Sequence, residues 1–308
     1  MDTLTEISTP RNSLKLKASI LGSGFGIYGY LPAMCSLGWE VATLARYQQK
    51  IRERSELTSY SRDIQFLDSE LELIDYGSAF IFTRTPVLQF EFLNKNLQSF
   101  KNSTHVFLEK PLTNSLSNSM SLLDNLRTNQ IQFSLGYLFP YTDWFMDLEG
   151  ICAGTGNQIT INWAIPISRS NWKNDESLGG GIVNSFLIHF VPVLARLGFS
   201  LSNIDIHSED GCISLKSQSD NCIMVTAKNV TTNFLFEIWV NNQPTPMFQS
   251  QTPFGLKPEA GKPDPRISAL KKYLSDSIKT SRNFDFSYQT ELSVLSFLKM
   301  FITQKNIQ

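Results

Sequence analysis

The sequence predicts an α/β fold, in which an N-terminal Rossmann-type, doubly wound parallel sheet precedes a C-terminal α+β domain with an open, mainly antiparallel sheet. Short apolar strands alternate with helical patterns between residues 17 and 136, and this alternation is typical of a parallel sheet covered by helices. A glycine-rich turn connects the first strand to the first helix, as in dinucleotide-binding units. After residue 158 strand patterns follow one another directly, which indicates antiparallel pairing with one open face.

The elements of the first half follow from short apolar runs and from helical periodicity. An apolar strand at 18–21 leads into the glycine turn, then into an apolar helix and a second strand at 40–45. The later elements are a strand at 78–83, a helix at 87–100, a strand at 105–109, a helix at 115–129 and a strand at 132–137.

The strands of the second half alternate apolar and polar residues with a period of two, as half-buried strands do. They lie at 158–165, 204–207, 212–216, 222–227 and 233–240. We also expect a helix at about 180–197, a proline-rich loop at 243–265 and closing helices at 265–280 and 289–304. An apolar open sheet face is usually covered by a partner, so we expect a homodimer or homotetramer.

Length and composition allow two domains. The 308 residues are 42% apolar, which is enough for two separate cores. We expect a polar N-terminal tail at 1–16, a dinucleotide-binding domain at 17–140 and a domain for substrate binding and dimerisation at 141–308.

Charge and hydropathy exclude several classes of protein. The net charge is −1 without a basic stripe, so we expect no nucleic-acid partner. The longest apolar stretch, 186–199, is too short to span a membrane, and the N-terminus lacks the pattern of a signal peptide. The four cysteines and three histidines have no metal-ligand spacing. We therefore expect a cytoplasmic protein with free thiols and no metal site.

The glycine turn reads Gly22-Ser23-Gly24-Phe25-Gly26. Glycine lets the backbone turn sharply and approach a pyrophosphate at the N-terminus of the following helix. Ile27 stands where the dinucleotide fingerprint has its third glycine, a position that serves helix packing more than phosphate contact. The alternative is a flexible loop, but the flanking strands and helix favour a dinucleotide site.

The end of the second expected strand indicates which nicotinamide dinucleotide binds. A carboxylate there would hold the ribose 2′-hydroxyl of NAD, whereas an arginine suits the 2′-phosphate of NADP. This chain has Ala45-Arg46 and no carboxylate between Val41 and Arg52. We predict NADP as the cofactor, with NAD possible; the alternative is that Arg46 is an ordinary surface residue.

Two further motifs follow the glycine turn in order. They are Glu109-Lys110-Pro111 and the run Gly179-Gly180-Gly181, with His189 eight residues after it. Together the three motifs resemble the Gfo/Idh/MocA oxidoreductases, such as glucose–fructose oxidoreductase and inositol dehydrogenase. The resemblance covers roughly residues 17–305. It implies an NAD(P)-dependent oxidoreductase that transfers a hydride between nicotinamide and a sugar, a nucleotide sugar or a similar small molecule.

The resemblance also implies residue roles. Lys110 would hydrogen-bond the reacting oxygen of the substrate and help to move its proton, and His189 would assist as an acid or base or orient the substrate. In this family the Lys110–Pro111 peptide bond is often cis. The cofactor-binding candidates are Gly22, Gly24, Phe25, Gly26, Arg46, Thr83, Arg84, Pro86, Glu109 and Lys110. The substrate-binding candidates are Tyr137, Trp172, Asn184, Ser185 and His189.

Some positions depart from the family pattern. The aspartates that the family places four residues before and three residues after the histidine are Ser185 and Pro192 here. Without an aspartate partner His189 is less basic, but Lys110 can still transfer the proton if burial or the cofactor ring lowers its pKa. The loop after the strand at 78–83 has Arg84 in place of a threonine and Gln89 in place of a histidine. Arg84 could reach a phosphate or an anionic substrate.

These departures leave two other functions open. One is a protein that binds a dinucleotide or a sugar on the same fold without turnover. The other is an imine reductase, because reduction needs an acid rather than a base. Plain structural roles are also open, with Lys110 as a surface lysine, His189 as a core histidine, the glycine run as a linker and Trp172 as a packing aromatic.

Overall fold

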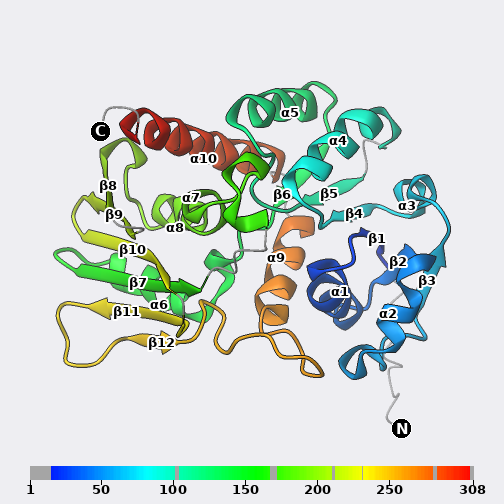
Figure 1. Cartoon of the computed structure of the whole chain (residues 1–308), viewed down its shortest axis with the longest axis horizontal. Coiled ribbons are helices and arrows are strands. Elements are labelled where there is room, and N and C mark those ends of the chain that lie inside the picture. Colours follow the sequence, from blue (N-terminus) through cyan, green and yellow to red (C-terminus); the bar gives the residue numbers. More distant parts are fainter. Residues whose placement is uncertain are drawn as a thin grey trace, which may run out of the picture.

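The computed structural model describes residues 15–100, 104–166, 172–209, 212–230, 232–279 and 283–305. Most of the expected N-terminal tail lies outside these ranges. The chain forms two six-stranded sheets, here called sheet A and sheet B. Figure 1 shows them side by side, with helix α9 between them. The predicted fold class is confirmed, whereas the predicted domain boundary near residue 140 stays a prediction.

Sheet A is parallel throughout, with the strand order β3-β2-β1-β4-β5-β6. This is a doubly wound order, and it reverses between β1 and β4, where such sheets bind ligands beyond the carboxyl ends of their strands. The strands are β1 (Lys17–Leu21), β2 (Glu40–Leu44), β3 (Ile64–Leu67), β4 (Ala79–Phe82), β5 (His105–Leu108) and β6 (Gln132–Leu135).

Both faces of sheet A are buried, which explains why its strands are apolar at successive positions. Ile20 and Ile81 belong to one hydrophobic cluster, while their neighbours Leu21 and Phe82 belong to the other. The sheet's connecting helices are α1 (Leu31–Ser36), α2 (Gln48–Arg52), α3 (Glu70–Tyr76), α4 (Pro86–Asn96) and α5 (Leu116–Thr128). A π-helical turn, Gly26–Tyr30, leads from the glycine turn into α1.

Sheet B has the strand order β12-β11-β7-β10-β9-β8, and only β7 and β10 pair in parallel among the described strands. Burial alternates along β10, where Ile223 and Val225 are buried and Met224 is exposed, so one face packs and the other is open. The strands are β7 (Gln158–Pro166), β8 (Ile204–Glu209), β9 (Cys212–Gln218), β10 (Cys222–Val230), β11 (Leu235–Val240) and β12 (Phe248–Ser250).

The prediction of one continuous helix at 180–197 was wrong, because the segment is broken into three pieces. The pieces are α7 (Ile182–Ser185), a 3₁₀ turn (Leu187–His189) and α8 (Phe190–Arg196). The break lies at Phe186, whose φ of −132° and ψ of −55° leave the helical region. As a result the His189 amide bonds the Phe186 carbonyl and not that of Ser185. The Ser185 carbonyl is thereby released for another donor.

Two helices from the end of the chain pack back onto sheet A. Helix α9 (Ile267–Lys279) contacts α1, and α10 (Asn283–Lys305) contacts β6 and α5 as well as α8. Helix α10 begins six residues before the expected helix at 289–304. Five elements were not expected: α2, β3, α3, α6 (Asp143–Cys152) and β12, which lies inside the proline-rich loop.

Two absences concern the described part of the chain alone. Among those residues no helix combines the length and hydropathy needed to cross a membrane. No group of three or more His, Cys, Asp or Glu side chains there is arranged to hold a metal ion.

Candidate active site

A cavity of about 640 Å³ lies beyond the carboxyl ends of the strands of sheet A. It is bordered on one side by the glycine turn and the ends of β4 and β5, and on the other by the segments around α7 and the proline-rich loop. The structure brings nine of the predicted site residues together on its lining: Gly24, Phe25, Thr83, Arg84, Glu109, Lys110, Trp172, Ser185 and His189.

The glycine turn has one open position and two crowded ones. A Cβ atom on Gly22 would lie 2.6 Å from the Thr83 carbonyl oxygen, and one on Gly26 would lie 2.8 Å from the Ile20 side chain. A Cβ on Gly24 would meet nothing within 4 Å, although Gly24 borders the cavity. Gly22 and Gly26 therefore let the turn pack against β1 and β4, while Gly24 leaves backbone open to the cavity, as a pyrophosphate requires.

Three buried polar atoms on the cavity lining have no hydrogen-bond partner within the described ranges. They are Thr83 Oγ1, Glu109 Oε1 and His189 Nδ1. Buried polar atoms are nearly always paired, so each such exception calls for an explanation. A polar ligand in the cavity would supply partners, and a dinucleotide with its substrate fits both the open glycine turn and these atoms.

Lys110 follows β5, and its side chain reaches the break between α7 and α8. Its ammonium donates to the carbonyl oxygen of Ser185, the acceptor that the break at Phe186 releases. Burial and then the charge of the nearby Lys173 lower the pKa of Lys110 to about 7, and Glu109 opposes the change. The ammonium can therefore both hold and release a proton near neutral pH.

Gln89 holds the segment that carries Lys110. Its side-chain amide donates to the carbonyl oxygens of Glu109 at 2.9 Å and Leu112 at 2.8 Å. Its side-chain oxygen accepts from the Glu109 amide at 3.0 Å. This buried amide thus bonds the chain on both sides of Lys110, at the position where the family pattern has a histidine.

His189 lies flat against Phe139, with ring centroids 4.5 Å apart and planes 13° apart. The residue is 8% exposed, and burial, followed by the charges of Lys110, Lys173 and Arg266, lowers the pKa of its imidazole well below the usual value. His189 is therefore a neutral imidazole near pH 7. In that form it can donate or accept a hydrogen bond, but it is a weak base.

Two cations that sequence reasoning missed also line the cavity: Lys173 and Arg266. Burial and then the charge of Arg266 lower the pKa of Lys173. Arg266 forms a bidentate pair with Asp264, at 2.8 and 2.6 Å, and its guanidinium carbon lies 3.7 Å from the centre of the Phe25 ring. Lys173 could have been found as the neighbour of Trp172, whereas Arg266 stands in no motif.

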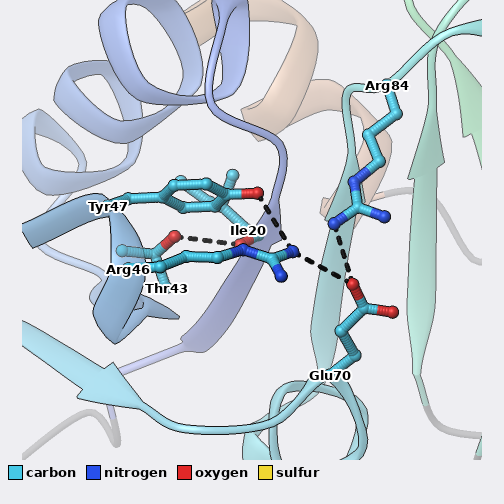
Figure 2. A network of polar contacts seen from close by, with 6 residues as sticks. All are labelled: Ile20, Thr43, Arg46, Tyr47, Glu70 and Arg84. Atoms are coloured by element: carbon cyan, nitrogen blue, oxygen red, sulfur yellow. Dashed lines mark hydrogen bonds and ion pairs between the residues drawn. The ribbon is translucent and has the colours of Figure 1, made fainter. Parts of the chain in front are cut away.

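Arg46 and Arg84 converge on one carboxylate near the edge of this site (Figure 2). Arg46 follows β2 and donates to Glu70 Oε1 at 3.1 Å, while Arg84 follows β4 and donates to the same oxygen at 2.8 Å. Glu70 is the first residue of α3. The segment between Val41 and Arg52 lacks a carboxylate, but Glu70 of α3, the helix between β3 and β4, supplies one.

The comparisons with known proteins begin with a curated relative. The chain is 23% identical over 189 residues to an uncharacterized oxidoreductase of Synechocystis sp., and the match covers 58% of this chain and 50% of that protein. The chain therefore spans about half the length of the curated relative that it matches. No protein-family model matches the chain.

Solved structures match nearly the whole chain. The WlbA (WbpB) dehydrogenase from Thermus thermophilus, solved with NAD and UDP-GlcNAcA, has a TM-score of 0.65 at 12% identity, covering 91% of this chain and 94% of that one. A myo-inositol dehydrogenase from Corynebacterium glutamicum has a TM-score of 0.63 at 12% identity, with coverages of 93% and 96%. The chain has the Gfo/Idh/MocA fold. A super-repressor mutant of Gal80p from Saccharomyces cerevisiae shares it, with a TM-score of 0.66 at 10% identity and coverages of 94% and 96%.

The Gfo/Idh/MocA resemblance seen in three motifs is thus confirmed for the fold, and the Lys110–Pro111 peptide bond is cis as it implied. Six predicted site residues do not line the cavity that holds Lys110. Gly22 and Gly26 pack within the glycine turn and Arg46 pairs with Glu70; the other three are Tyr137, Pro86 and Asn184. Tyr137 is buried and donates to Glu291 at 2.8 Å, and Pro86 is the first residue of α4. Asn184 donates to the Gly180 carbonyl at 3.2 Å and lines a separate cavity of about 1190 Å³.

Proposed function

We propose that this chain is an NADP-dependent oxidoreductase. It transfers a hydride between nicotinamide and the carbonyl or alcohol carbon of a sugar, a nucleotide sugar or a similar small molecule. The observation that carries the proposal is the position of Lys110, whose buried ammonium with a pKa lowered to about 7 lines the same cavity as the open glycine turn. A bound nicotinamide would supply or accept the hydride, and the residues of the chain supply the rest.

Lys110 is the proposed proton donor in the reductive direction. A substrate oxygen becomes more basic as its carbon accepts a hydride, so an ammonium beside it stabilises charge that develops only in the transition state. The Ser185 carbonyl holds the ammonium in place. His189 is proposed to orient the substrate by a hydrogen bond, because its neutral ring offers an unpaired buried Nδ1.

Gly24, Thr83 and Glu109 are proposed to contact the dinucleotide, and Arg46 and Arg84 its 2′-phosphate. Trp172 and Ser185 border the part of the cavity assigned to the substrate. Reduction of a carbonyl or an imine needs an acid at the reacting atom, and the lowered pKa of Lys110 supplies one without the family aspartate. The site therefore favours the reductive direction.

The proposed preference for NADPH is tested at Arg46. Arg46→Ala is expected to weaken NADPH binding by about 10- to 100-fold, because it removes a charge-assisted contact worth roughly 1.5–3 kcal/mol. NADH binding should change by less than about threefold. Calorimetric titration measures both affinities, and the exposed Arg52 nearby provides the matched control Arg52→Ala. Tighter binding of NADH than of NADPH by the unmodified protein would contradict the preference.

A second candidate function is a regulatory protein that binds a dinucleotide or a sugar without turnover. Two observations favour it: Ser185 and Pro192 replace the family aspartates, and the same fold occurs in a protein described as a super-repressor mutant of Gal80p. Incubation with NADPH and a panel of sugars, carbonyl compounds and imines separates the two functions. Oxidation of NADPH with any of them supports the enzyme, and binding without oxidation supports the regulator.

The open face of sheet B is proposed to mediate a homodimer or a larger homo-oligomer, with no membrane or nucleic-acid partner. Met224 is 39% exposed on β10, between the buried residues Ile223 and Val225. Multi-angle light scattering at micromolar concentration should give at least twice the 34.9 kDa chain mass, and Met224→Glu should shift the protein toward the monomer. A monomeric parent protein would contradict this proposal.

Since all four cysteines are free, the reducing cytoplasm stays our expected location.

A further inference from the structure

The network around Glu70 joins three segments that are distant in the sequence. Arg46 stands at the end of β2, Arg84 at the end of β4 and Glu70 at the start of α3. Strand β1 lies between β2 and β4 in sheet A, so the two arginines flank the strand that leads into the glycine turn. Figure 2 shows both guanidinium groups directed at the carboxylate of Glu70.

The two guanidinium groups form a site for one anion. Arg46 lies over the Tyr47 ring, with its guanidinium carbon 5.3 Å from the ring centre, and contacts the Tyr47 hydroxyl at 3.4 Å. Both arginines then donate to a single oxygen of Glu70, at 3.1 and 2.8 Å. Planar guanidinium groups that converge in this way match a phosphate, which offers three acceptor oxygens and a larger charge than a carboxylate.

The carboxylate that occupies this site is held loosely. The side chains of Glu70, Arg46 and Arg84 are 35%, 56% and 22% exposed, and each ion pair at such partly exposed positions contributes little to stability. Glu70 can therefore leave the arginines at small cost when a stronger anion arrives. NADH has no 2′-phosphate, so Glu70 can stay paired with the arginines when NADH binds.

We propose that Glu70 is an internal competitor of the 2′-phosphate and thereby sets the preference between NADPH and NADH. It neutralises Arg46 and Arg84 when NADH is bound and must be displaced when NADPH is bound. Glu70 therefore lowers the ratio of NADPH affinity to NADH affinity, which would be larger if the two arginines had no carboxylate partner. This inference rests on the proposed function, because it assumes that the cavity binds a nicotinamide dinucleotide.

The test compares Glu70→Gln with the matched variant Glu72→Gln. Glu72 lies in the same first turn of α3, and its carboxylate accepts from the Asp68 amide, so both variants remove one charge from the same turn. Calorimetry with NADPH and NADH, and with 2′,5′-ADP and 5′-ADP, measures binding without turnover. Thermal unfolding confirms that both variants are folded.

In Glu70→Gln the NADPH dissociation constant is expected to fall about three- to tenfold, which equals about 0.7–1.4 kcal/mol. The NADH dissociation constant should stay within about twofold. The ratio of affinities for 2′,5′-ADP and 5′-ADP should shift in the same direction, and the shift should shrink at high salt because exposed charges are screened. Glu72→Gln should leave every ratio within about twofold.

Three results overturn the inference. An unchanged ratio in Glu70→Gln means that Glu70 does not compete with the 2′-phosphate. Weaker NADH binding without tighter NADPH binding means that Glu70 holds the ribose hydroxyl instead. An equal shift of the NADPH-to-NADH affinity ratio in Glu72→Gln means that the change comes from the net charge of the turn and not from the position of Glu70. If the ratio shifts as expected although the parent prefers NADH, the proposed NADP preference fails and this inference stands; if neither dinucleotide binds, both fail.

Discussion

Lys110→Met is expected to lower the rate of NADPH oxidation by about 10²–10⁴-fold, the usual contribution of a positioned acid or base. Methionine keeps much of the length of the side chain but has no proton to donate, so the oxygen that becomes basic during reduction loses its partner. NADPH binding should persist, because Gly24 and the arginines are unchanged. Single-turnover mixing with a reactive carbonyl or imine substrate measures the chemical step directly.

The pH dependence of the same reaction gives a second test of this role. Because the pKa of Lys110 is lowered to about 7, its protonated fraction falls tenfold per pH unit above that value. The reductive rate should therefore decline above about pH 7, whereas a lysine with the usual pKa would sustain it to above pH 10. The residual rate of Lys110→Met should lack this decline.

Two other variants distinguish Lys110 from its neighbours. His189→Ala should cost less than Lys110→Met, because a neutral imidazole without a carboxylate partner contributes only a hydrogen bond. Lys173→Met removes a second cation from the same cavity lining and should also cost less. If Lys110→Met reacts as fast as the parent, or if Lys173→Met is equally slow, Lys110 is not the proton donor.

Gly24→Val is expected to weaken NADPH and NADH binding by at least about 100-fold, or about 2.7 kcal/mol. The added side chain would enter the space that the structure leaves open beside Gly24 and would keep the pyrophosphate from the backbone. Since a Cβ there meets no protein atom within 4 Å, the melting temperature should stay close to that of the parent. Calorimetry and thermal unfolding measure the two effects separately.

Other glycines supply the controls for this experiment. Gly150 lies in α6 and is equally open, so Gly150→Ala should leave dinucleotide affinity unchanged. Gly22→Val should instead destabilise the fold, because its Cβ would lie 2.6 Å from the Thr83 carbonyl oxygen. Undiminished dinucleotide affinity in a folded Gly24→Val protein would refute the assignment of the glycine turn.

The sequence predicted the elements whose signal is local. Strand β4 is apolar at all four positions and β1 at three of five, because both faces of sheet A are buried, and such runs are readily seen. Strand β3 was missed because only Ile64 of its four residues is buried, so its apolar signal is weaker than that of the other strands of sheet A. The break at Phe186 was missed because 180–197 is mostly apolar, and periodicity cannot show a single residue that leaves helical dihedrals.

The site residues that belong to sequence motifs could be predicted, whereas those brought to the site by tertiary packing could not. Gly24, Lys110 and His189 stand in recognisable patterns, and the structure places all three on one cavity lining. Glu70 meets Arg46 across 24 residues of sequence, so a search for a carboxylate beside Arg46 could not find it. Arg266 is brought to the Phe25 ring by α9, which depends on the tertiary packing of the whole chain.

Helix α9 also affects the order in which the protein becomes complete during synthesis. Its residues Leu270 and Leu274 are fully buried in the hydrophobic cluster that contains Ile20 and Ile81, so part of this face of sheet A is covered by a helix that follows sheet B in the chain. A ribosome that adds about 5–20 residues per second exposes that face for many seconds after β4 has emerged. That part of sheet A therefore stays exposed to solvent until the helix has been synthesised.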